Sequence, residues 1–151
     1  MGLSFSDDHY ADYIMNTLYV MCGVPGSGKS TTSKQMADEY GLERFSFDEM
    51  KCFCLDDYMH LAINSIQDGK NVILDSTNLR ANIRKKILQT INDISCRKVI
   101  VYMNTPLEEC LDRNRHRASR LQDFIIESSY RSLQLPTLDE GWDEIIYIEN
   151  N

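Results

Sequence analysis

The sequence predicts a single α/β domain, with a sheet of about five mostly parallel strands and helices on both faces. Short apolar segments alternate with segments of helical periodicity along the chain. A glycine-rich turn follows the first apolar segment, and an aspartate follows each of the next two. With 151 residues, 42% of them hydrophobic and 26% charged, the chain is long enough for one domain with a buried core.

The first part of the chain is expected to contain a strand, a helix and a second strand. Residues 17–22 are a short apolar run that leads into the glycine-rich turn. The helix expected over residues 29–40 is closed by Gly41, a residue that suits a helix end. The second strand, residues 42–47, ends at Asp48. The domain is expected to occupy residues 17–151, after an N-terminal extension over residues 1–16.

The middle of the chain is expected to place a strand between two helices. Apolar periodicity predicts a helix over residues 56–67, which the following Asp-Gly pair stops. Residues 71–74 form an apolar strand that ends at Asp75. Apolar residues on one face predict a second helix over residues 82–94. Four basic residues on or before it are expected to be mainly a solvated face, with one or two lining a groove: Arg80, Arg84, Lys85 and Lys86.

The last part of the chain repeats the alternation of strand and helix. Residues 98–103 are an apolar strand, and residues 106–117 are a helix with Thr105 as N-cap and Pro106 at its first position. A further helix is expected over residues 124–133 and a final strand over residues 144–148. Because the strands are expected to be parallel, ligands should gather beyond their carboxyl ends.

Charge and cysteine usage limit the class of protein. The net charge of −7 argues against a general nucleic-acid coat, yet four of the nine arginines lie between Arg113 and Arg120. The five cysteines have neither disulfide-framework nor zinc-site spacing, which suits a reducing cytoplasm. No segment has the length and apolarity of a membrane span, so no membrane partner is expected. The sequence indicates no obligate protein partner.

The segment VMCGVPGSGKSTT, residues 20–32, has the spacing of a phosphate-binding loop (P-loop). Glycines let backbone amides approach phosphate oxygens, and the following helix presents free N–H groups. Lys29 would reach the β- and γ-phosphates of ATP, and the Ser30 hydroxyl would ligate Mg²⁺. The expected ATP-binding residues of this loop are Gly23, Pro25, Gly26, Ser27, Gly28, Lys29, Ser30 and Thr31.

No Asn-Lys-x-Asp guanine-reading motif occurs, which argues against a GTPase and leaves the small kinases. Phosphoryl transfer to an acceptor needs a carboxylate that takes the proton of the attacking hydroxyl. Asp48 is the candidate, with Lys51 placed to hold an anion of the acceptor. The alternative is that Asp48 is only the N-cap of a following helix.

A second carboxylate follows the third expected strand. Asp75 has the placement of a Walker B residue, which would hold Mg²⁺ beside Ser30. Thr77 and Asn78 are candidate acceptor contacts, together with Ser76. The three residues could equally form only a turn and a helix cap.

Arginines cluster at the end of the fourth expected helix, within LDRNRHRASR. Arg113, Arg117 and Arg120 would share one helix face, and Arg115 would point elsewhere. Cations suit a helix C-terminus, but four exceed that need. The cluster therefore predicts an arginine-rich lid over ATP, with Arg113 and Arg117 catalytic and Arg115 and Arg120 among the ATP contacts.

With these motifs, the chain resembles the kinase domain of polynucleotide 5′-hydroxyl kinases, within the zeta-toxin and adenylate-kinase-like group of P-loop kinases. The resemblance runs from about Leu18 to Ile148. Its parts are GVPGSGKST, Asp48 with a basic residue three positions later, DSTN, PLEECLDRNRHR and PTLDEGWDEI. The last is similar to a PTxxEGF stretch in eukaryotic polynucleotide kinase-phosphatases.

The resemblance implies a role for several of the same residues. Asp48 would be the general base for a 5′-hydroxyl, and Arg117, with Arg113 or Arg115, would contact phosphates in the transition state. The family often has an arginine, which grips an acceptor 3′-phosphate, where this chain has Lys51. Lysine lacks the bidentate fork of arginine, so this departure weakens the case for a nucleic-acid acceptor.

The sequence therefore predicts an ATP- and Mg²⁺-dependent phosphotransferase whose acceptor is a 5′-hydroxyl end of DNA or RNA. One alternative is a small-molecule kinase acting on a nucleoside, a sugar or a similar alcohol. Another is a non-catalytic module that binds ATP in a regulatory role.

Overall fold

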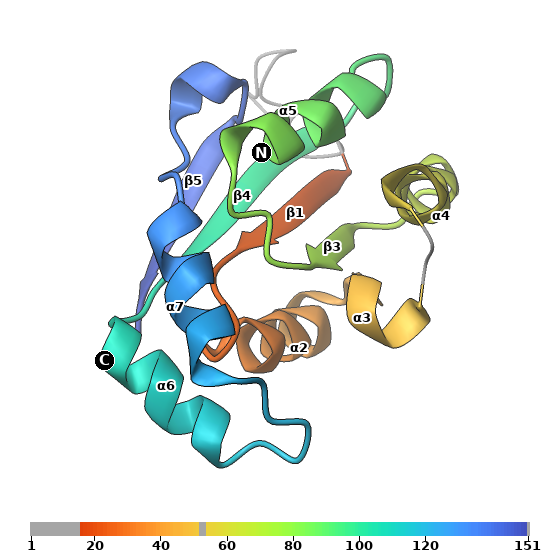
Figure 1. Cartoon of the computed structure of the whole chain (residues 1–151). Helices are drawn as coiled ribbons and strands as arrows, with labels where there is room; N and C mark the ends of the chain where they lie inside the picture. Colours follow the sequence, from red (N-terminus) through yellow and green to blue (C-terminus); the bar gives the residue numbers. More distant parts are fainter. Residues whose placement is uncertain (1–15, 52–53, 151) are drawn as a thin grey trace, which may run out of the picture.

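The computed structural model describes residues 16–51 and 54–150 (Figure 1). Its five strands form one sheet in the order β2-β3-β1-β4-β5, and all four pairings are parallel. Strand β1 (Thr17–Cys22) is central, between β3 (Val72–Asp75) and β4 (Arg97–Asn104), while β2 (Glu43–Ser46) and β5 (Glu144–Glu149) form the edges. The predicted α/β class and parallel sheet are confirmed.

The strands are in a register that aligns apolar residues across the sheet. Val20 of β1 lies opposite Leu74 of β3 and Ile100 of β4. Phe45 and Ile145 continue this row on the two edge strands. All five side chains belong to the same hydrophobic cluster, so the row joins the sheet to the helices on that face.

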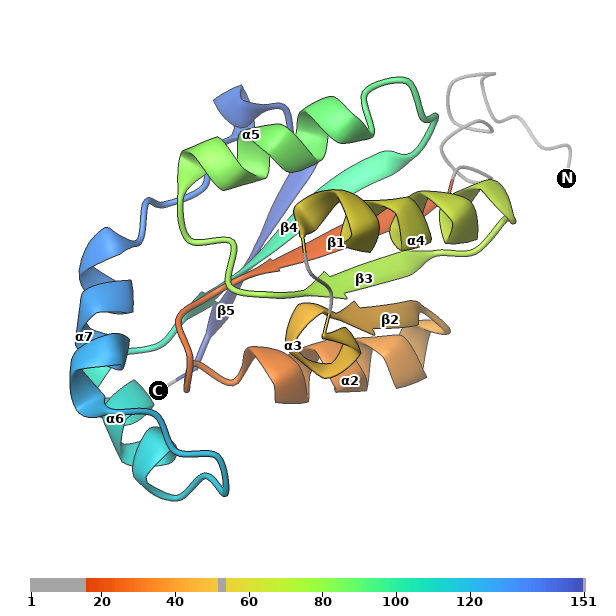
Figure 2. The ribbon, with the colours of Figure 1, turned by 45° about the vertical axis from the view of Figure 1, so that its right-hand side comes forward.

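Helices cover both faces of the sheet (Figure 2). Helices α4 (Leu55–Gln67) and α5 (Ala81–Thr90) contribute to the larger apolar cluster, on one face. Helix α2 (Lys29–Tyr40) contributes to the other cluster, which contains the alternate residues of β1 and β4. Both faces are therefore buried, as expected of a parallel sheet.

Helices α6 (Leu107–Arg115) and α7 (Asp123–Ser132) lie together beside the turn that follows β1 (Figures 1 and 2). A third apolar cluster joins them to this turn through Val24, Cys110 and Ile126. The predicted lid segment is thus packed against the end of the central strand.

The boundary after β2 differs from the prediction. The strand stops at Ser46, and Phe47–Met50 form a short helix, α3. The Ser46 hydroxyl accepts a hydrogen bond from the Glu49 amide at 3.4 Å. Ser46 is the N-cap, so Asp48 lies within the first helical turn and neither directly follows the strand nor caps the helix.

Two other helices end earlier than predicted. Helix α5 stops at Thr90, because Asn92 and Asp93 favour the turn that follows it. Helix α6 stops at Arg115, so Arg117 and Arg120 lie outside it. The expectation that Arg113, Arg117 and Arg120 share a helix face is therefore wrong.

The expectation of a solvated basic face is wrong for Arg84 of α5. Its side chain is fully buried, with 0% exposure, whereas Lys85 and Lys86 are exposed. Of the expected N-terminal extension, only residue 16 lies within the described part of the chain. Among the helices of the described residues, none has the length and apolarity needed to cross a bilayer.

Burial in the central strand should dominate stability. Leu18 of β1 is fully buried, so Leu18→Ala should lower the free energy of unfolding by about 3 kcal/mol through lost burial and a residual cavity. Leu135→Ala is the matched control, because Leu135 is 63% exposed and its truncation should cost less than about 0.5 kcal/mol. Urea denaturation of both variants measures the difference; similar losses would contradict the assigned core.

Candidate active site

The turn between β1 and α2 has a backbone that only glycine fits at two positions. Gly26 has φ +87° and Gly28 has φ +94°, in the left-handed region. A Cβ on Gly26 would lie 2.5 Å from the Cys110 carbonyl oxygen, and one on Gly28 would lie 2.4 Å from Asn150 Nδ2. The turn is thus enclosed by α6 and by the residue after β5.

Hydrogen bonds from three distant segments hold this turn. The Gly23 amide donates to the Thr77 carbonyl at 3.0 Å. The Ser27 carbonyl accepts from Thr105 Oγ1 at 2.8 Å and from Asn150 Nδ2 at 2.9 Å. The expected N-cap role of Thr105 is wrong, since its hydroxyl holds the turn while Pro106 precedes α6.

A cavity of about 230 Å³ opens beside the turn and the start of α2. It brings five predicted ATP-binding residues of the turn together with two predicted lid arginines. The lining residues are Gly26, Gly28, Lys29, Ser30, Thr31, Arg113 and Arg117. Gly23, Pro25 and Ser27 are not among them.

The Lys29 ammonium is electrostatically poised for an anion. Burial lowers the pKa of Lys29 below its ordinary value, and the nearby carboxylates of Asp75 and Asp48 oppose this effect. The positive charges of Arg117 and Arg44 lower it further. A bound phosphate would supply the charge partner that this desolvated cation needs.

The four lid arginines fall into two pairs. Arg113 and Arg117 line the cavity, and Arg113 Nη2 also donates to Asn150 Oδ1 at 3.1 Å. Arg115 and Arg120 lie near Asp123 of α7 instead, at 3.6 and 3.7 Å. In this structure Arg115 and Arg120 therefore lie at α7 and do not line the cavity beside the turn.

Asn114 closes the loop that carries Arg117 and Arg120. Its side chain is buried, donates to the Leu121 carbonyl at 2.7 Å and accepts from the Leu121 amide at 3.0 Å. This pair of bonds ends α6 and returns the chain to α7 after a loop over residues 116–122. The loop keeps Arg117 beside Arg113 at the cavity.

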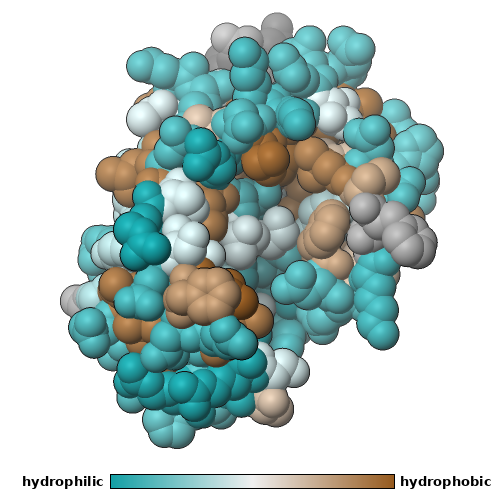
Figure 3. Space-filling model, in the orientation of Figure 1, coloured by the Kyte–Doolittle hydropathy of each residue, from teal (hydrophilic) through white to brown (hydrophobic). Residues whose placement is uncertain are grey.

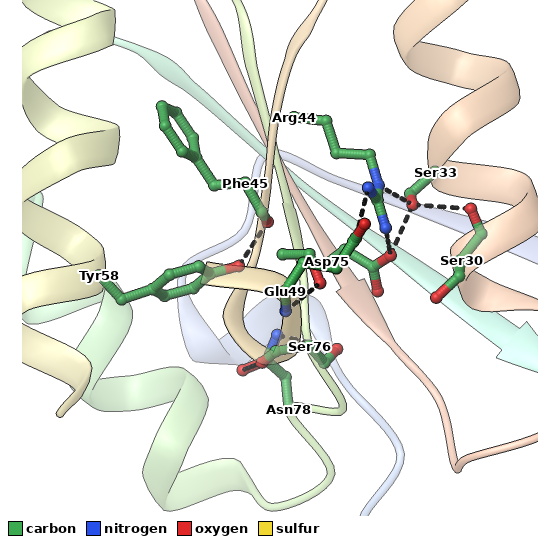
Figure 4. A network of polar contacts seen from close by, with 10 residues as sticks. Ser30, Ser33, Arg44, Phe45, Glu49, Tyr58, Asp75, Ser76 and Asn78 are labelled. Carbon is green, nitrogen blue, oxygen red and sulfur yellow. Dashed lines mark hydrogen bonds and ion pairs between the residues drawn. The ribbon is translucent and has the colours of Figure 1, made fainter. Parts of the chain in front are cut away.

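Asp75, at the end of β3, belongs to a buried polar network (Figure 4). Its Oδ2 accepts from Ser33 Oγ at 2.7 Å and from Arg44 Nη2 at 2.6 Å. Arg44 also forms an ion pair of 2.7 Å with Glu49 of α3. Burial alone would raise the pKa of Asp75, but the bonds from Arg44 and Ser33 and the charge of Lys29 outweigh it, so its pKa lies below the ordinary value.

The donor set at this edge of the sheet fits Mg²⁺. Ser30 presents an exposed hydroxyl at the start of α2, beside the phosphate cavity. Asp75 Oδ2 is engaged by Arg44 and Ser33, which leaves Oδ1 as its candidate ligand atom. A hydroxyl, one carboxylate and phosphate oxygens are ligands that Mg²⁺ takes in such sites.

A second cavity, of about 420 Å³, lies between α3 and the β3–α5 loop. It contains the predicted general base, Asp48, and the predicted acceptor contact Thr77, with apolar walls from Phe47, Leu55 and Ile83. Figure 3 shows apolar side chains around a hollow below α5 on this face. The Phe47 ring is held edge-on against Tyr58 at 5.1 Å, and the Tyr58 hydroxyl donates to the Phe45 carbonyl.

The remaining predicted acceptor contacts differ in placement. Asn78 lines this cavity, but its amide is buried and donates to the Met21 carbonyl of β1 at 2.8 Å. Asn78 also has φ +45°, a turn conformation that asparagine tolerates. Lys51 ends α3 with φ +53° and is exposed, outside the cavity lining.

Several residues of the site escaped the sequence analysis: Ser33, Arg44, Asn114 and Asn150. Ser33 lies three residues after Ser30 and therefore on the same face of α2, a spacing that could have indicated it. Arg44 is a cation within a predicted strand that leads to the sheet edge where the glycine-rich turn lies, which is a second available signal. Asn150 carries no local signal, because its partner Ser27 lies 123 positions away, and the partner of Asn114 is a backbone group of the following loop, which no side-chain pattern indicates.

Comparison with known proteins agrees with this geometry. The AAA domain family AAA_33 matches residues 18–129, which contain the turn, both aspartates and the lid. The chain belongs to this family. The predicted resemblance to P-loop kinases is thereby confirmed. The protein is a kinase of the P-loop family, and the match does not identify its acceptor.

Two curated relatives and one solved structure are similar to the chain. An L-seryl-tRNA(Sec) kinase of Methanococcus maripaludis is 25% identical over 83% of this chain and 56% of its own length. A bifunctional polynucleotide phosphatase/kinase of Schizosaccharomyces pombe is 24% identical over 91% of this chain and 34% of its own length. A fungal RNA kinase shares the fold, with a TM-score of 0.73 and 16% identity. The match covers 90% of this chain and 38% of the RNA kinase chain. The chain thus spans about half or less of the length of these relatives.

The contact of Gly26 with α6 should be needed for nucleotide binding. Gly26→Ala places a Cβ against the Cys110 carbonyl, so α6 must shift and ATP should bind about tenfold more weakly. Gly69→Ala is the matched control: its φ is +89°, close to that of Gly26, and nothing lies within 4 Å of its Cβ. Titration with a fluorescent ATP analogue measures both; equal weakening would contradict the cradle.

The pairing of Arg44 with Asp75 should stabilise the fold in a pH-dependent way. Arg44→Met leaves a buried carboxylate without its cation and should lower the free energy of unfolding by about 3 kcal/mol at neutral pH. The folded pKa of Asp75 is lowered, so this stabilisation is present above the ordinary carboxyl value of 3.8 and is lost as pH falls through the folded value.

Urea denaturation across about pH 3 to pH 8 measures this effect. The loss in Arg44→Met should shrink in acid, because protonated Asp75 needs no cation. Arg97→Met, which removes the exposed pair with Glu144, should cost less than about 1 kcal/mol throughout. A loss in Arg44→Met that is equal at every pH would contradict the assignment.

Proposed function

We propose that this protein transfers the γ-phosphate of ATP to a 5′-hydroxyl end of DNA or RNA, with Mg²⁺ and with Asp48 as general base. The observation that carries the proposal is the placement of Asp48. It is the carboxylate among the residues that line the second cavity, and this cavity adjoins the phosphate-binding turn through the bond between Gly23 and Thr77.

The cavity suits one nucleoside unit. Its volume of about 420 Å³ is within the range of small-ligand sites, and its apolar walls can contact a base or sugar ring. Arg80 lies among the lining residues and offers a cation to an acceptor phosphate. Lys51, outside the lining, would contact a more distant phosphate of the acceptor.

The reaction follows from the two cavities. The acceptor hydroxyl gives its proton to Asp48 as its oxygen bonds to the γ-phosphorus and the bond to the bridging oxygen breaks, so that ADP leaves. Lys29, Arg113 and Arg117 neutralise charge on the phosphates. Ser30 and Asp75 would hold Mg²⁺, which would neutralise negative charge on the phosphate oxygens of ATP. Arg115 and Arg120 would contribute to ATP binding by keeping the lid in place.

A small-molecule kinase is the second candidate, and the charge of the chain favours it. The net charge of −7 repels a polyanion, whereas a neutral nucleoside or sugar would enter the same cavity without that cost. Both candidates use the same base and the same phosphate cavity. They differ in whether the acceptor is a single small molecule or a nucleic-acid chain that continues beyond its first nucleotide.

Transfer of labelled phosphate from ATP distinguishes these functions. The acceptors are 5′-hydroxyl DNA and RNA oligonucleotides, 3′-phosphorylated nucleosides, free nucleosides and simple sugars, each with and without Mg²⁺. We expect label on the oligonucleotides, in a magnesium-dependent manner. Label on monomers alone would favour the small-molecule kinase, and ATP binding without transfer to any acceptor would favour a regulatory module.

Asp48→Asn should lower kcat by about 10²- to 10⁴-fold while ATP binding is retained, because the amide cannot take the proton of the hydroxyl. Asp57→Asn is the matched control, since Asp57 is an exposed aspartate of α4 outside both cavities. Steady-state transfer and ATP-analogue binding measure both variants. Full activity in Asp48→Asn would remove the assigned base.

A further inference from the structure

Arg84 of α5 is a fully buried arginine with no assigned part in phosphate transfer. Its Nε donates to Glu140 Oε1 and its Nη2 to Glu140 Oε2, both at 2.8 Å. This two-point contact is the fork geometry in which arginine binds a carboxylate most strongly. Trp142 Nε1 also donates to Glu140 Oε1, at 3.0 Å, and this bond fixes the carboxylate.

The other end of the guanidinium binds the backbone of the acceptor cavity. Arg84 Nη1 donates to the Asn78 carbonyl at 2.9 Å and to the Leu79 carbonyl at 3.0 Å. Both carbonyls belong to the β3–α5 loop, residues 76–80, and every residue of this loop lines the cavity that contains Asp48. The loop also joins the phosphate-binding turn, through the Thr77 carbonyl.

The contact thus links two segments that are distant in sequence. Glu140 lies between α7 and β5, on the opposite side of Arg84 from the loop. Arg84 takes the Glu140 carboxylate as its charge partner and uses its remaining donors to hold carbonyl oxygens. Lysine could not do this, since its ammonium lacks the planar fork.

We propose that Arg84, held by Glu140, is a positioning residue that fixes the β3–α5 loop and thereby sets where an acceptor lies relative to Asp48. For its kinetic readout this inference rests on the proposed function. Displacement of the loop would move one wall of the cavity while the phosphate cavity keeps its lining of Lys29, Arg113 and Arg117. Arg84 holds the carbonyls of Asn78 and Leu79 and not that of Thr77, which supports the phosphate-binding turn, so the acceptor should be affected rather than ATP.

The test uses a double variant, Arg84→Met with Glu140→Gln. Removal of one partner alone would leave a buried charge and could unfold the protein, whereas removal of both charges is often tolerated. The glutamine carbonyl still offers an acceptor to Trp142. The control is Arg97→Gln with Glu144→Gln, which removes the same two charges from an exposed ion pair.

Two readouts separate positioning from a merely structural role. In the double variant the KM for the acceptor should rise about ten- to hundredfold, with the KM for ATP and the thermal midpoint close to those of the control. The single variant Arg84→Lys should have an acceptor KM between those of the native chain and the double variant, because an ammonium can still reach one of the carbonyls. Amide hydrogen exchange of residues 76–80 should accelerate, while that of β1 should not.

The exchange measurement keeps this inference distinct from the proposed function. If the native chain transfers phosphate to no acceptor, the proposed function fails, and hydrogen exchange alone judges whether Arg84 holds the loop. Unchanged exchange over residues 76–80 in the double variant would overturn the inference. An acceptor KM equal to that of the control, or equal rises in both KM values, would also overturn it.

Discussion

The site depends on one backbone constraint, which is the shape of the turn between β1 and α2. A phosphate can approach amide groups only where they are not covered by side chains or used by other backbone groups. Gly26 and Gly28 meet the first condition through positive φ angles and missing Cβ atoms. The turn keeps this conformation because segments after β3, β4 and β5 each place a partner on it, namely Thr77, Thr105 and Asn150.

The parallel sheet explains how those partners converge. Strand β1 is central, so the chain segments that leave β3 and β4 emerge on either side of the turn that leaves β1, and the segment after β5 follows at the next position. All the carboxyl ends open on the same edge. Two arginines from the lid and two aspartates from separate elements reach the same edge, although they are far apart in sequence.

The charges at this edge are already arranged by the protein. Arg44 is held between Asp75 and Glu49, and Arg115 and Arg120 lie near Asp123. Arg113 is held by Asn150. Groups that are fixed before a ligand arrives need little reorganisation when charge develops in a reaction, which is the main source of electrostatic stabilisation in enzymes. The buried pair of Arg84 and Glu140 extends the same principle to the backbone of the acceptor cavity.

The sequence by itself determined the fold class, the glycine-rich turn after β1 and the aspartate that ends β3, Asp75. These features depend on local spacing: apolar periodicity sets the elements, and glycine, lysine and serine must be neighbours to form the turn. The arginine cluster was also visible, because its members are close in sequence.

Only the tertiary structure determined which arginine faces which partner. Asn114 bonds to Leu121 and ends α6 early, which brings Arg113 and Arg117 to the cavity and leaves Arg115 and Arg120 at Asp123. Arg84 has the sequence context of a solvated helix residue, yet it is buried. The burial could not be predicted because the partner of Arg84, Glu140, lies 56 positions away. Local periodicity does not encode which distant residues come together in the fold.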